Sequence, residues 1–327
     1  MSDVLLNVQD LRISIPTTHG LVHAVNGISY EVMRGEIMGI IGESGSGKSV
    51  SSYAVMHLLP ENFIVESGKV LLDGEELLHK SNAEMQAYRG KKISMIFQDP
   101  LSCLDPVYTI GYQLTETILA HENISKEEAQ TRAKEMLHAV GLRDVERLMN
   151  QYSFEISGGM RQRVMIAIAL VCSPELLIAD EPTTALDVTI QDQILRLLRK
   201  LSEENRMTMI FITHNFNVAA QICDRVSVMY GGHIMEQGPI ADVFANPAHP
   251  YTQAILNAMP KMNTSPEERL TPIPGEPINP VHMPAGCPFH PRCSQARKIC
   301  KEEFPAETII SDKHFAYCHR LEETADE

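Results

Sequence analysis

An eight-residue segment reads Gly42-Glu43-Ser44-Gly45-Ser46-Gly47-Lys48-Ser49 and constrains what the surrounding chain must form. It has the spacing G-x-x-x-x-G-K-S, follows an apolar run at residues 37–41 and enters a helix-compatible run that begins with Ser49 and Val50. Glycines let successive backbone N–H groups turn toward one anion, and the following helix adds its positive N-terminal end. A strand, a glycine-rich turn and a helix in this order predict a phosphate-binding loop, whereas a surface turn rich in glycine and serine needs no such context. We expect Lys48 to reach the β- and γ-phosphates of a nucleotide and Ser49 to bind Mg²⁺.

Composition narrows the class of protein. The chain has 327 residues, which suits about two domains. Its formal net charge of −14 argues against a nucleic-acid-binding surface as the main function. We find no apolar run of ~18 residues or more and therefore expect no membrane-spanning helix. We also find no signal-peptide pattern, so we expect a cytoplasmic protein.

Hydrophobic patterning predicts the architecture. Alternating apolar positions at residues 4–15 and 24–33 indicate an antiparallel β region. Apolar runs at residues 93–97, 176–180 and 207–213 are separated by helical segments, which favours a parallel sheet covered on both faces. The sequence therefore predicts an α/β fold with a P-loop, RecA-like nucleotide-binding sheet and an antiparallel β subdomain.

Two further parts of the chain depart from this sheet pattern. Residues of about 99–163 are helical in pattern, for example at residues 126–140, and predict an inserted α-helical subdomain. From residue 260 onward the composition shifts, and Pro266, Pro272, Pro274, Pro277, Pro280 and Pro284 predict a linker with little regular structure. We expect a nucleotide-binding unit at residues 1–259 and a Pro/Cys-rich C-terminal extension at residues 260–327.

Polar side chains follow three of the predicted strands. Asp180 and Glu181 end one strand, Gln98 follows a second and His214 ends a third. The aspartate suits Mg²⁺, the glutamate suits orientation or deprotonation of a water, and the amide suits Mg²⁺ or that same water. Each of these residues taken alone is also an ordinary polar residue at the end of a strand. Their positions after a phosphate-binding loop favour the functional interpretation.

A second anion-binding element occurs in the chain. Ser157, Gly158, Gly159 and Met160 open a helical segment at residues 161–172, and a helix N-terminus with glycines attracts anions. The phosphate-binding loop does not need this element for the same nucleotide. The second element is therefore informative about the class of protein.

The order of these motifs resembles the ATP-binding cassette of ABC transporters over roughly residues 4–255. The resemblance implies that the chain binds ATP, with residues 42–50 as the ATP-binding segment. It implies a head-to-tail dimer in which the loop of one subunit and the signature segment, Ser157 to Met160, of the other enclose one ATP. The roles implied for single residues are Mg²⁺ binding by Ser49, Gln98 and Asp180, catalytic base for Glu181, coupling sensor for Gln98, D-loop for Asp187 and switch histidine for His214.

Three positions depart from the general pattern of that family. Met160 replaces a glutamine, Asn215 replaces an aspartate, and Ile15 stands where an aromatic residue usually stacks on adenine. The sequence therefore does not identify what contacts the base.

The chain is most similar to the dipeptide/oligopeptide (and nickel) importer branch, through the phrases at residues 42–51, 96–100, 157–163 and 249–252. That resemblance implies an ATPase that powers peptide uptake at the cytoplasmic face of the membrane. The implied partners are two transmembrane permease subunits, a second ABC ATPase and an extracytoplasmic peptide-binding protein. The sequence does not specify the transported substrate.

The extension has a chemistry of its own. Cys287, Cys293, Cys300 and Cys318 are separated by five, six and seventeen residues. In a chain without an export signal such a cluster indicates a metal centre, either Fe–S or Zn²⁺, with reduced structural thiols as the alternative. The importer branch is associated with a [4Fe–4S] cluster at such a site, so the resemblance places iron ahead of zinc.

The competing function is a soluble ABC ATPase that acts on nucleic acid or the ribosome. Members of that kind carry either a long coiled-coil insertion or two cassettes in one chain. Only about 100 residues separate the two anion-binding elements here, and they show no sustained heptads. Together with the acidic composition, this favours the transporter subunit, for which we expect no nucleic-acid partner.

Overall fold

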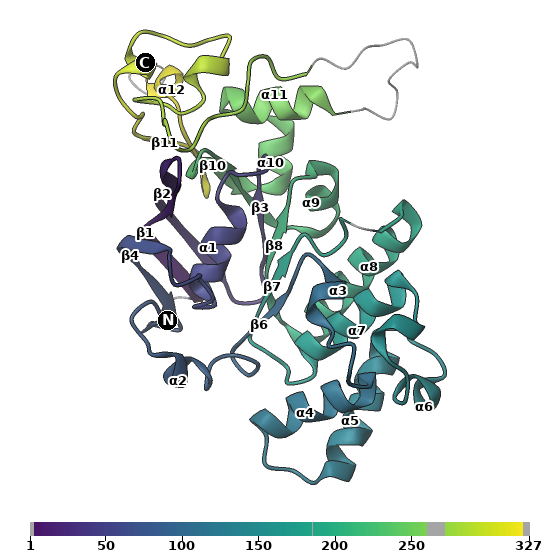
Figure 1. Cartoon of the computed structure of the whole chain (residues 1–327). Coiled ribbons are helices and arrows are strands. Elements are labelled where there is room, and N and C mark those ends of the chain that lie inside the picture. The colour runs from purple at the N-terminus through teal and green to yellow at the C-terminus, as the bar shows by residue number, and fades with distance from the viewer. Residues whose placement is uncertain (1–2, 185, 260–271, 323–327) are drawn as a thin grey trace.

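The computed structural model describes residues 3–184, 186–259 and 272–322 of the chain. Ala185, part of the predicted D-loop segment, and residues 260–271 at the start of the predicted extension lie outside the described residues. The described chain forms two sheets, a lobe of helices and a C-terminal part that lies against the larger sheet (Figure 1).

The smaller sheet is antiparallel, as predicted. Its four strands lie in the order β2-β1-β4-β5. Buried and exposed residues alternate at residues 11–13 of the first strand and 28–32 of the second, as the sequence pattern predicts, and register shifts interrupt the alternation elsewhere. The strands are β1 (Val4–Thr17), β2 (Gly20–Met33), β4 (Ile64–Leu72) and β5 (Glu75–Glu76).

The larger sheet has eight strands in the order β11-β12-β10-β9-β3-β8-β7-β6. Strands β9, β3, β8, β7 and β6 are parallel, and the remaining three pair antiparallel at one edge. Every residue of β3, β7 and β8 is buried, as near-continuous apolar runs predict. The strands are β3 (Ile37–Ile41), β6 (Ile93–Ile96), β7 (Leu176–Asp180), β8 (Thr208–Thr213), β9 (Arg225–Tyr230), β10 (His233–Pro239), β11 (Glu307–Ser311) and β12 (His314–Tyr317).

Two hydrophobic clusters cover the two faces of this sheet. Met38 and Ile40 of β3 belong to the cluster shared with the antiparallel sheet, whereas Ile37 and Ile41 of the same strand pack with the helices. The sheet therefore lies between the β subdomain and the helical layer. The helices outside the lobe are α1 (Lys48–Val55), α2 (Asn82–Met85), α7 (Gly158–Leu170), α8 (Val188–Asn205), α9 (Phe216–Ile222), α10 (Ile240–Ala245) and α11 (Pro250–Ala258).

The predicted helical lobe is present and projects from the end of the molecule opposite the C-terminal part (Figure 1). In α5 the buried face consists of Ala129, Ala133 and Leu137, as the helical periodicity predicts. Its elements are α3 (Pro100–Cys103), α4 (Ile110–His121), α5 (Lys126–Ala139), α6 (Val145–Leu148) and the 3₁₀ turn η1 (Ser153–Glu155). None of the helices in the described part of the chain is long and apolar enough to cross a membrane.

The described part of the proline-rich linker, residues 272–284, contains no helix or strand, as predicted, and regular structure returns nearer the C-terminus. Strands β11 and β12 form a hairpin, and β12 pairs with β10, so this hairpin extends the larger sheet. His314 Nε2 lies 2.9 Å from Oε1 of Glu236, and both side chains are buried. Local proline patterns miss this pairing because it depends on a distant strand. The remaining elements are the 3₁₀ turns η2 (His290–Arg292) and η3 (Ile299–Lys301) and α12 (His319–Glu322).

Candidate functional site

The predicted phosphate-binding loop connects β3 to α1. Gly45 and Gly47 have φ values of 78° and 97°, which only glycine adopts without strain. A Cβ on Gly47 would lie 2.3 Å from the carbonyl oxygen of Ala24, so the loop also depends on close backbone packing. Helix α1 starts at Lys48 without a side-chain cap at Gly47. Its first N–H groups therefore remain available to an anion.

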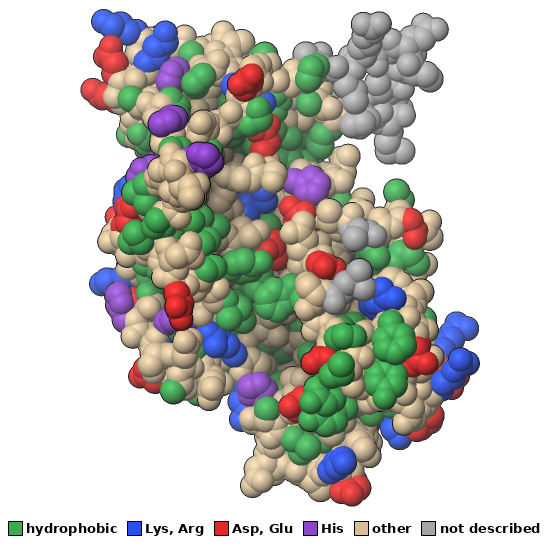
Figure 2. Space-filling model, in the orientation of Figure 1, with side chains coloured by type: hydrophobic (Ala, Val, Ile, Leu, Met, Phe, Trp, Pro, Cys, Tyr) green, Lys and Arg blue, Asp and Glu red, His purple; other side chains and the backbone are tan. Residues whose placement is uncertain are grey.

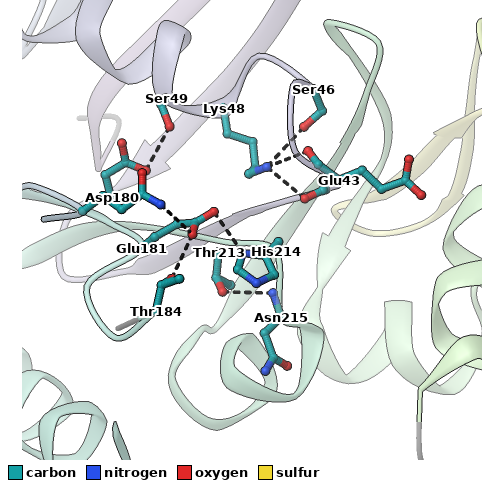
Figure 3. A network of polar contacts seen from close by, with 12 residues as sticks. Glu43, Ser46, Lys48, Ser49, Asp180, Glu181, Thr184, Thr213, His214 and Asn215 are labelled. Atoms are coloured by element: carbon teal, nitrogen blue, oxygen red, sulfur yellow. Dashed lines mark hydrogen bonds and ion pairs between the residues drawn. The ribbon is translucent and has the colours of Figure 1, made fainter. Parts of the chain in front are cut away.

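Lys48 lies within the loop rather than pointing to solvent. Its Nζ donates hydrogen bonds to the carbonyl oxygens of Gly42 at 2.9 Å and Glu43 at 2.8 Å, and it lies 3.4 Å from Oγ of Ser46 (Figure 3). Burial lowers the pKa of Lys48, and the charge of Glu181 is the largest opposing influence. A phosphate at this position would replace neutral carbonyl partners with a charged one.

Ser49 and Asp180 meet at the start of α1 and the end of β7. The Ser49 hydroxyl donates to Oδ1 of Asp180 at 3.1 Å (Figure 3). The other carboxylate oxygen, Oδ2, is buried and has no hydrogen-bond partner among the described residues. Burial raises the pKa of Asp180. A hydroxyl beside a buried, unpartnered carboxylate oxygen fits a hard cation such as Mg²⁺.

Glu181 is the centre of a second polar network. Its carboxylate accepts hydrogen bonds from Thr184 Oγ1 at 2.8 Å and from Gln98 Nε2 at 3.3 Å, and it lies 3.0 Å from Nδ1 of His214. Burial works to raise the pKa of Glu181, but the contacts with His214 and Thr184 outweigh it and hold that pKa below its usual value. The structure thus brings together Gln98, Glu181 and His214, which the sequence placed after three separate strands.

The backbone at Glu181 is also unusual. Its φ of 46° lies in the left-handed region, and its N–H donates to the carbonyl oxygen of Ile212 in the neighbouring strand β8 at 3.0 Å. Such a conformation costs about 1–3 kcal/mol in a non-glycine residue and is concentrated at functional sites. No sequence motif indicated Thr184, whose hydroxyl orients the same carboxylate. The only signal for this residue was its position three residues after a glutamate at the end of a strand.

The second predicted anion-binding element begins helix α7. Ser157 Oγ accepts a hydrogen bond from Met160 N at 3.4 Å, while Ser157 and Gly158 are exposed. Asp187 caps the neighbouring helix α8 through the N–H groups of Thr189 and Ile190. Within the described parts of the chain we observe no hydrogen bond or ion pair between this element and the phosphate-binding loop. The structure therefore does not bring the two predicted phosphate sites together in one chain.

The departures at Asn215 and Ile15 have different structural outcomes. Asn215 caps α9 by accepting hydrogen bonds from the N–H groups of Asn217 and Val218. It thus serves as a helix cap in place of the expected aspartate. Ile15 pairs with Val22 in the hairpin of β1 and β2 and is partly buried. An aliphatic side chain at this position offers no ring for stacking.

The four cysteines of the extension line one small cavity. Cys287, Cys293, Cys300 and Cys318 surround about 20 Å³ of space. All four are free thiols. Burial raises the pKa of Cys287 to about 12, and burial also raises the pKa of Cys293 and Cys318. In residues 3–184, 186–259 and 272–322, no three His, Cys, Asp or Glu side chains are arranged to hold a metal ion. The convergence of the thiols thus agrees with the sequence, but their arrangement does not support the predicted cluster.

The fold and the loop define a P-loop ATPase, and comparison with known proteins gives its family. Residues 25–184 match the ABC transporter family, and residues 235–300 match the C-terminal region of oligopeptide/dipeptide transporters. The first segment contains both predicted anion-binding elements. The chain belongs to the ATP-binding proteins of ABC transporters.

Curated relatives match almost the whole chain. The oligopeptide transport ATP-binding protein OppD of Escherichia coli is 49% identical over 322 residues, which cover 98% of this chain and 95% of the relative. OppD of Bacillus subtilis is also 49% identical, over 95% of this chain and 87% of its own length. The dipeptide transport ATP-binding protein DppD of Bacillus subtilis is 45% identical over 98% of this chain and 96% of its own length.

A solved structure supports the cassette fold. The dimeric structure of MJ0796, a bacterial ABC transporter cassette, superimposes with a TM-score of 0.65 and 28% identity. It covers 72% of this chain and 99% of that cassette. A second structure of MJ0796, in a post-hydrolysis state bound to ADP and Pi, matches with the same score and coverage.

Proposed function

We propose that this chain is the ATP-hydrolysing subunit of an importer for dipeptides or oligopeptides, and that separate membrane permeases form the pore. The observation that carries the proposal is the pair of networks Ser49–Asp180 and Glu181–His214, which join the end of the phosphate-binding loop to the carboxyl ends of the adjacent strands β7 and β8. Relatives that match the chain almost end to end are peptide-transport ATP-binding proteins. The alternative of a soluble ATPase on nucleic acid or the ribosome is not favoured, because no described feature supports it.

In the proposed mechanism the loop residues Gly42 to Val50 bind the phosphates of ATP. Lys48 exchanges its carbonyl partners for phosphate oxygens, and the start of α1 contributes its free N–H groups. Ser49, Asp180 and Gln98 would hold Mg²⁺, which neutralises charge on the phosphates when bound. The unpartnered oxygen of Asp180 supports this assignment.

Glu181 is the proposed catalytic base. Its depressed pKa keeps the carboxylate ionised at neutral pH, so that it can accept a proton from the attacking water. Thr184 and His214 fix the direction of the carboxylate through their contacts at 2.8 and 3.0 Å. The amide of Gln98 touches the same carboxylate and follows β6, which makes it suited to sense the γ-phosphate region.

We infer that a second ATPase subunit supplies the signature segment. The start of α7 presents Ser157 and Gly158 to solvent, and α7 is a helix of 13 residues. A helix of that length has a substantial positive end, to which the phosphate-binding loop of the same chain makes no hydrogen bond within the described residues. A Cβ on Gly159 would contact Ile190, so the first turns of α7 and α8 lie next to each other. Asp187, at the start of α8, therefore lies beside the same surface in this proposal.

The helical lobe is the proposed docking site of a permease. It carries a groove of about 660 Å³ whose lining includes Tyr112, Leu119 and Met149. Val107 and Tyr108 beside it are exposed, and Figure 2 shows hydrophobic side chains gathered on this lobe. Exposed apolar surface of this kind marks an interaction site. One of the two permeases at this position would hold the chain at the cytoplasmic face of the membrane, with an extracytoplasmic peptide-binding protein on the other side.

We propose that the chain consists of a cassette at residues 1–259, with a helical subdomain at about 99–163, and an extension at residues 260–327.

We also propose a [4Fe–4S] cluster, or alternatively Zn²⁺, at the four cysteines of the extension. The chemistry of four soft donor atoms supports it, whereas their arrangement around the small cavity, within the described residues, fits no metal ion. Binding would require the thiols to lose protons and their side chains to rearrange around the metal.

Glu181→Gln tests the ATPase assignment. The amide retains the shape of the side chain but cannot accept the proton, so we expect ATP hydrolysis to fall by a factor of about 10²–10⁴. ATP binding should remain within about twofold of wild type, since the phosphate contacts are unchanged. Steady-state phosphate release and equilibrium ATP binding measure the two properties. Wild-type turnover in this variant would remove Glu181 as the base.

A further inference from the structure

One residue of the phosphate-binding loop carries a negative charge, although the loop is proposed to bind the negatively charged phosphates of ATP. Glu43 occupies the second position of the loop, and its carboxylate belongs to the same short segment that must hold the phosphates of ATP. The side chain is 30% exposed, so solvent screens it only in part. A negative charge near an anion site weakens anion binding unless another group neutralises it.

The neutralising group comes from the C-terminal part of the chain, 249 residues away. The guanidinium of Arg292 donates a hydrogen bond to Oε2 of Glu43 at 2.8 Å. The Arg292 side chain is only 6% exposed, and its Nε donates to the carbonyl oxygen of Pro274 at 3.0 Å. It also lies 5.9 Å from the centre of the Tyr230 ring. A buried arginine with these partners is fixed in direction, unlike a surface ion pair.

A buried aromatic cluster holds the backbone of the same loop residue. The hydroxyl of Tyr251 accepts a hydrogen bond from Glu43 N at 3.0 Å. The Tyr251 ring packs against Tyr230 and against Phe289, at centroid distances of 4.6 and 5.2 Å. Phe289 directly precedes the 3₁₀ turn η2, which ends at Arg292. The segment at residues 289–292 therefore contacts the loop through both a charge and a packed ring system.

We infer that Arg292 is a positioning residue for ATP binding, which acts by neutralising and fixing Glu43 in the phosphate-binding loop. The inference rests on the proposed role of this loop as the ATP site. Three contacts then fix the position of Glu43. Its carbonyl oxygen accepts a hydrogen bond from Lys48, its N–H donates to Tyr251 and its carboxylate pairs with Arg292. The C-terminal extension is thereby part of the apparatus that binds ATP, although it touches no phosphate itself.

Nucleotide affinity of charge variants tests this inference. Titration of the full-length chain with a fluorescent ATP analogue and Mg²⁺ gives the dissociation constant. We expect Arg292→Gln to raise it about tenfold, because the negative charge of Glu43 within the loop is then no longer neutralised, and Arg292→Lys to raise it no more than about threefold. In a Glu43→Gln background the carboxylate is absent, so Arg292→Gln should change affinity by less than about twofold. Lys298→Ala serves as the matched control, because this extension lysine is 90% exposed and its only described ion pair is with Glu302; it should bind as wild type.

The double-mutant comparison separates a specific role from a structural one. If Arg292→Gln lowers affinity equally with and without the Glu43→Gln change, Arg292 acts only through general stability, which overturns the inference. Wild-type affinity in folded Arg292→Gln also overturns it. In turnover assays we expect the KM for ATP to rise while kcat stays within about twofold. Failure of the wild-type chain to bind ATP would instead refute the proposed function, so the two failures are distinguishable.

Discussion

At the scale of single residues, the site depends on how buried charges are paired. Asp180 keeps one carboxylate oxygen without a partner among the described residues. Both carboxylate oxygens of Glu181, in contrast, contact neighbouring side chains. Two adjacent acids thus have different environments. One suits a cation and the other suits a water, which is how neighbouring carboxylates acquire separate roles.

The thiols of the extension allow a direct residue-scale prediction. If Cys287, Cys293, Cys300 and Cys318 bind a cluster, anaerobically purified wild-type protein will contain iron and absorb visible light, while Zn²⁺ will leave it colourless. Cys287→Ser should lose most of the metal, because serine is a poor ligand for either metal. Cys223→Ser is the matched control: Cys223 is buried beside Gly39 in the core and should leave the metal content unchanged. Full metal content in Cys287→Ser would exclude that ligand.

The sequence identified the site residues that belong to local motifs. The loop at residues 42–49 was predicted from its spacing and context. Gln98, Glu181 and His214 were predicted from their positions at strand ends and from the family resemblance, and the parallel strands bring these ends to one edge of the sheet. Arg292 and Tyr251 were not predicted as loop contacts. Their partner Glu43 lies more than 200 residues earlier in the chain, and no spacing rule connects such distant positions.

At the scale of elements, the join between the extension and the larger sheet was the main difference from expectation. No strand was predicted in the extension, yet β12 pairs with β10. The buried carboxylate of Glu236 in β10 accepts hydrogen bonds from Ala248 N and His249 N and also contacts His314. A strand at a sheet edge has unpaired backbone groups that another strand can satisfy. The pairing therefore depends on the assembled sheet, and the sequence of neither strand alone predicts it.

Helix α11 contains a titratable cap with a predictable pH effect. His249 is buried, and its Nδ1 accepts a hydrogen bond from Tyr251 N at 3.0 Å. Burial lowers the pKa of His249 to about 4, with the nearby charge of Glu236 opposing. The unfolded chain, with an ordinary histidine pKa near 6.5, takes up this proton first as the pH falls. The stabilising contribution is therefore complete above about pH 6.5 and is lost progressively toward pH 4.

We expect the free energy of unfolding to fall between pH 7 and pH 5 by about 2 kcal/mol more in wild type than in His249→Asn. Asparagine keeps a cap acceptor for α11 but does not titrate. Urea unfolding curves at the two pH values measure the difference. Equal losses in both proteins would show that His249 is not responsible for the acid sensitivity.

At the scale of the whole molecule, the two predicted anion-binding elements begin two different helices, α1 and α7. The phosphate-binding loop connects β3 to α1 and contacts the C-terminal extension through Arg292, while the predicted signature segment is the exposed start of α7 beside the helical lobe. In the proposed dimer, a second copy of this chain or a related ATPase subunit would bring its signature segment to the phosphate-binding loop of this chain. The groove on the lobe would then be the surface through which that dimer contacts a permease.

Peptide accumulation in proteoliposomes tests most directly whether this ATPase powers uptake. The vesicles contain this chain with its permeases, its partner ATPase and a peptide-binding protein, and the measured quantity is transported labelled oligopeptide. We predict accumulation with ATP and Mg²⁺, none with a non-hydrolysable analogue, and a loss of at least about tenfold with Glu181→Gln in an intact complex. Accumulation that persists without hydrolysis, or wild-type hydrolysis that moves no peptide, would contradict the account.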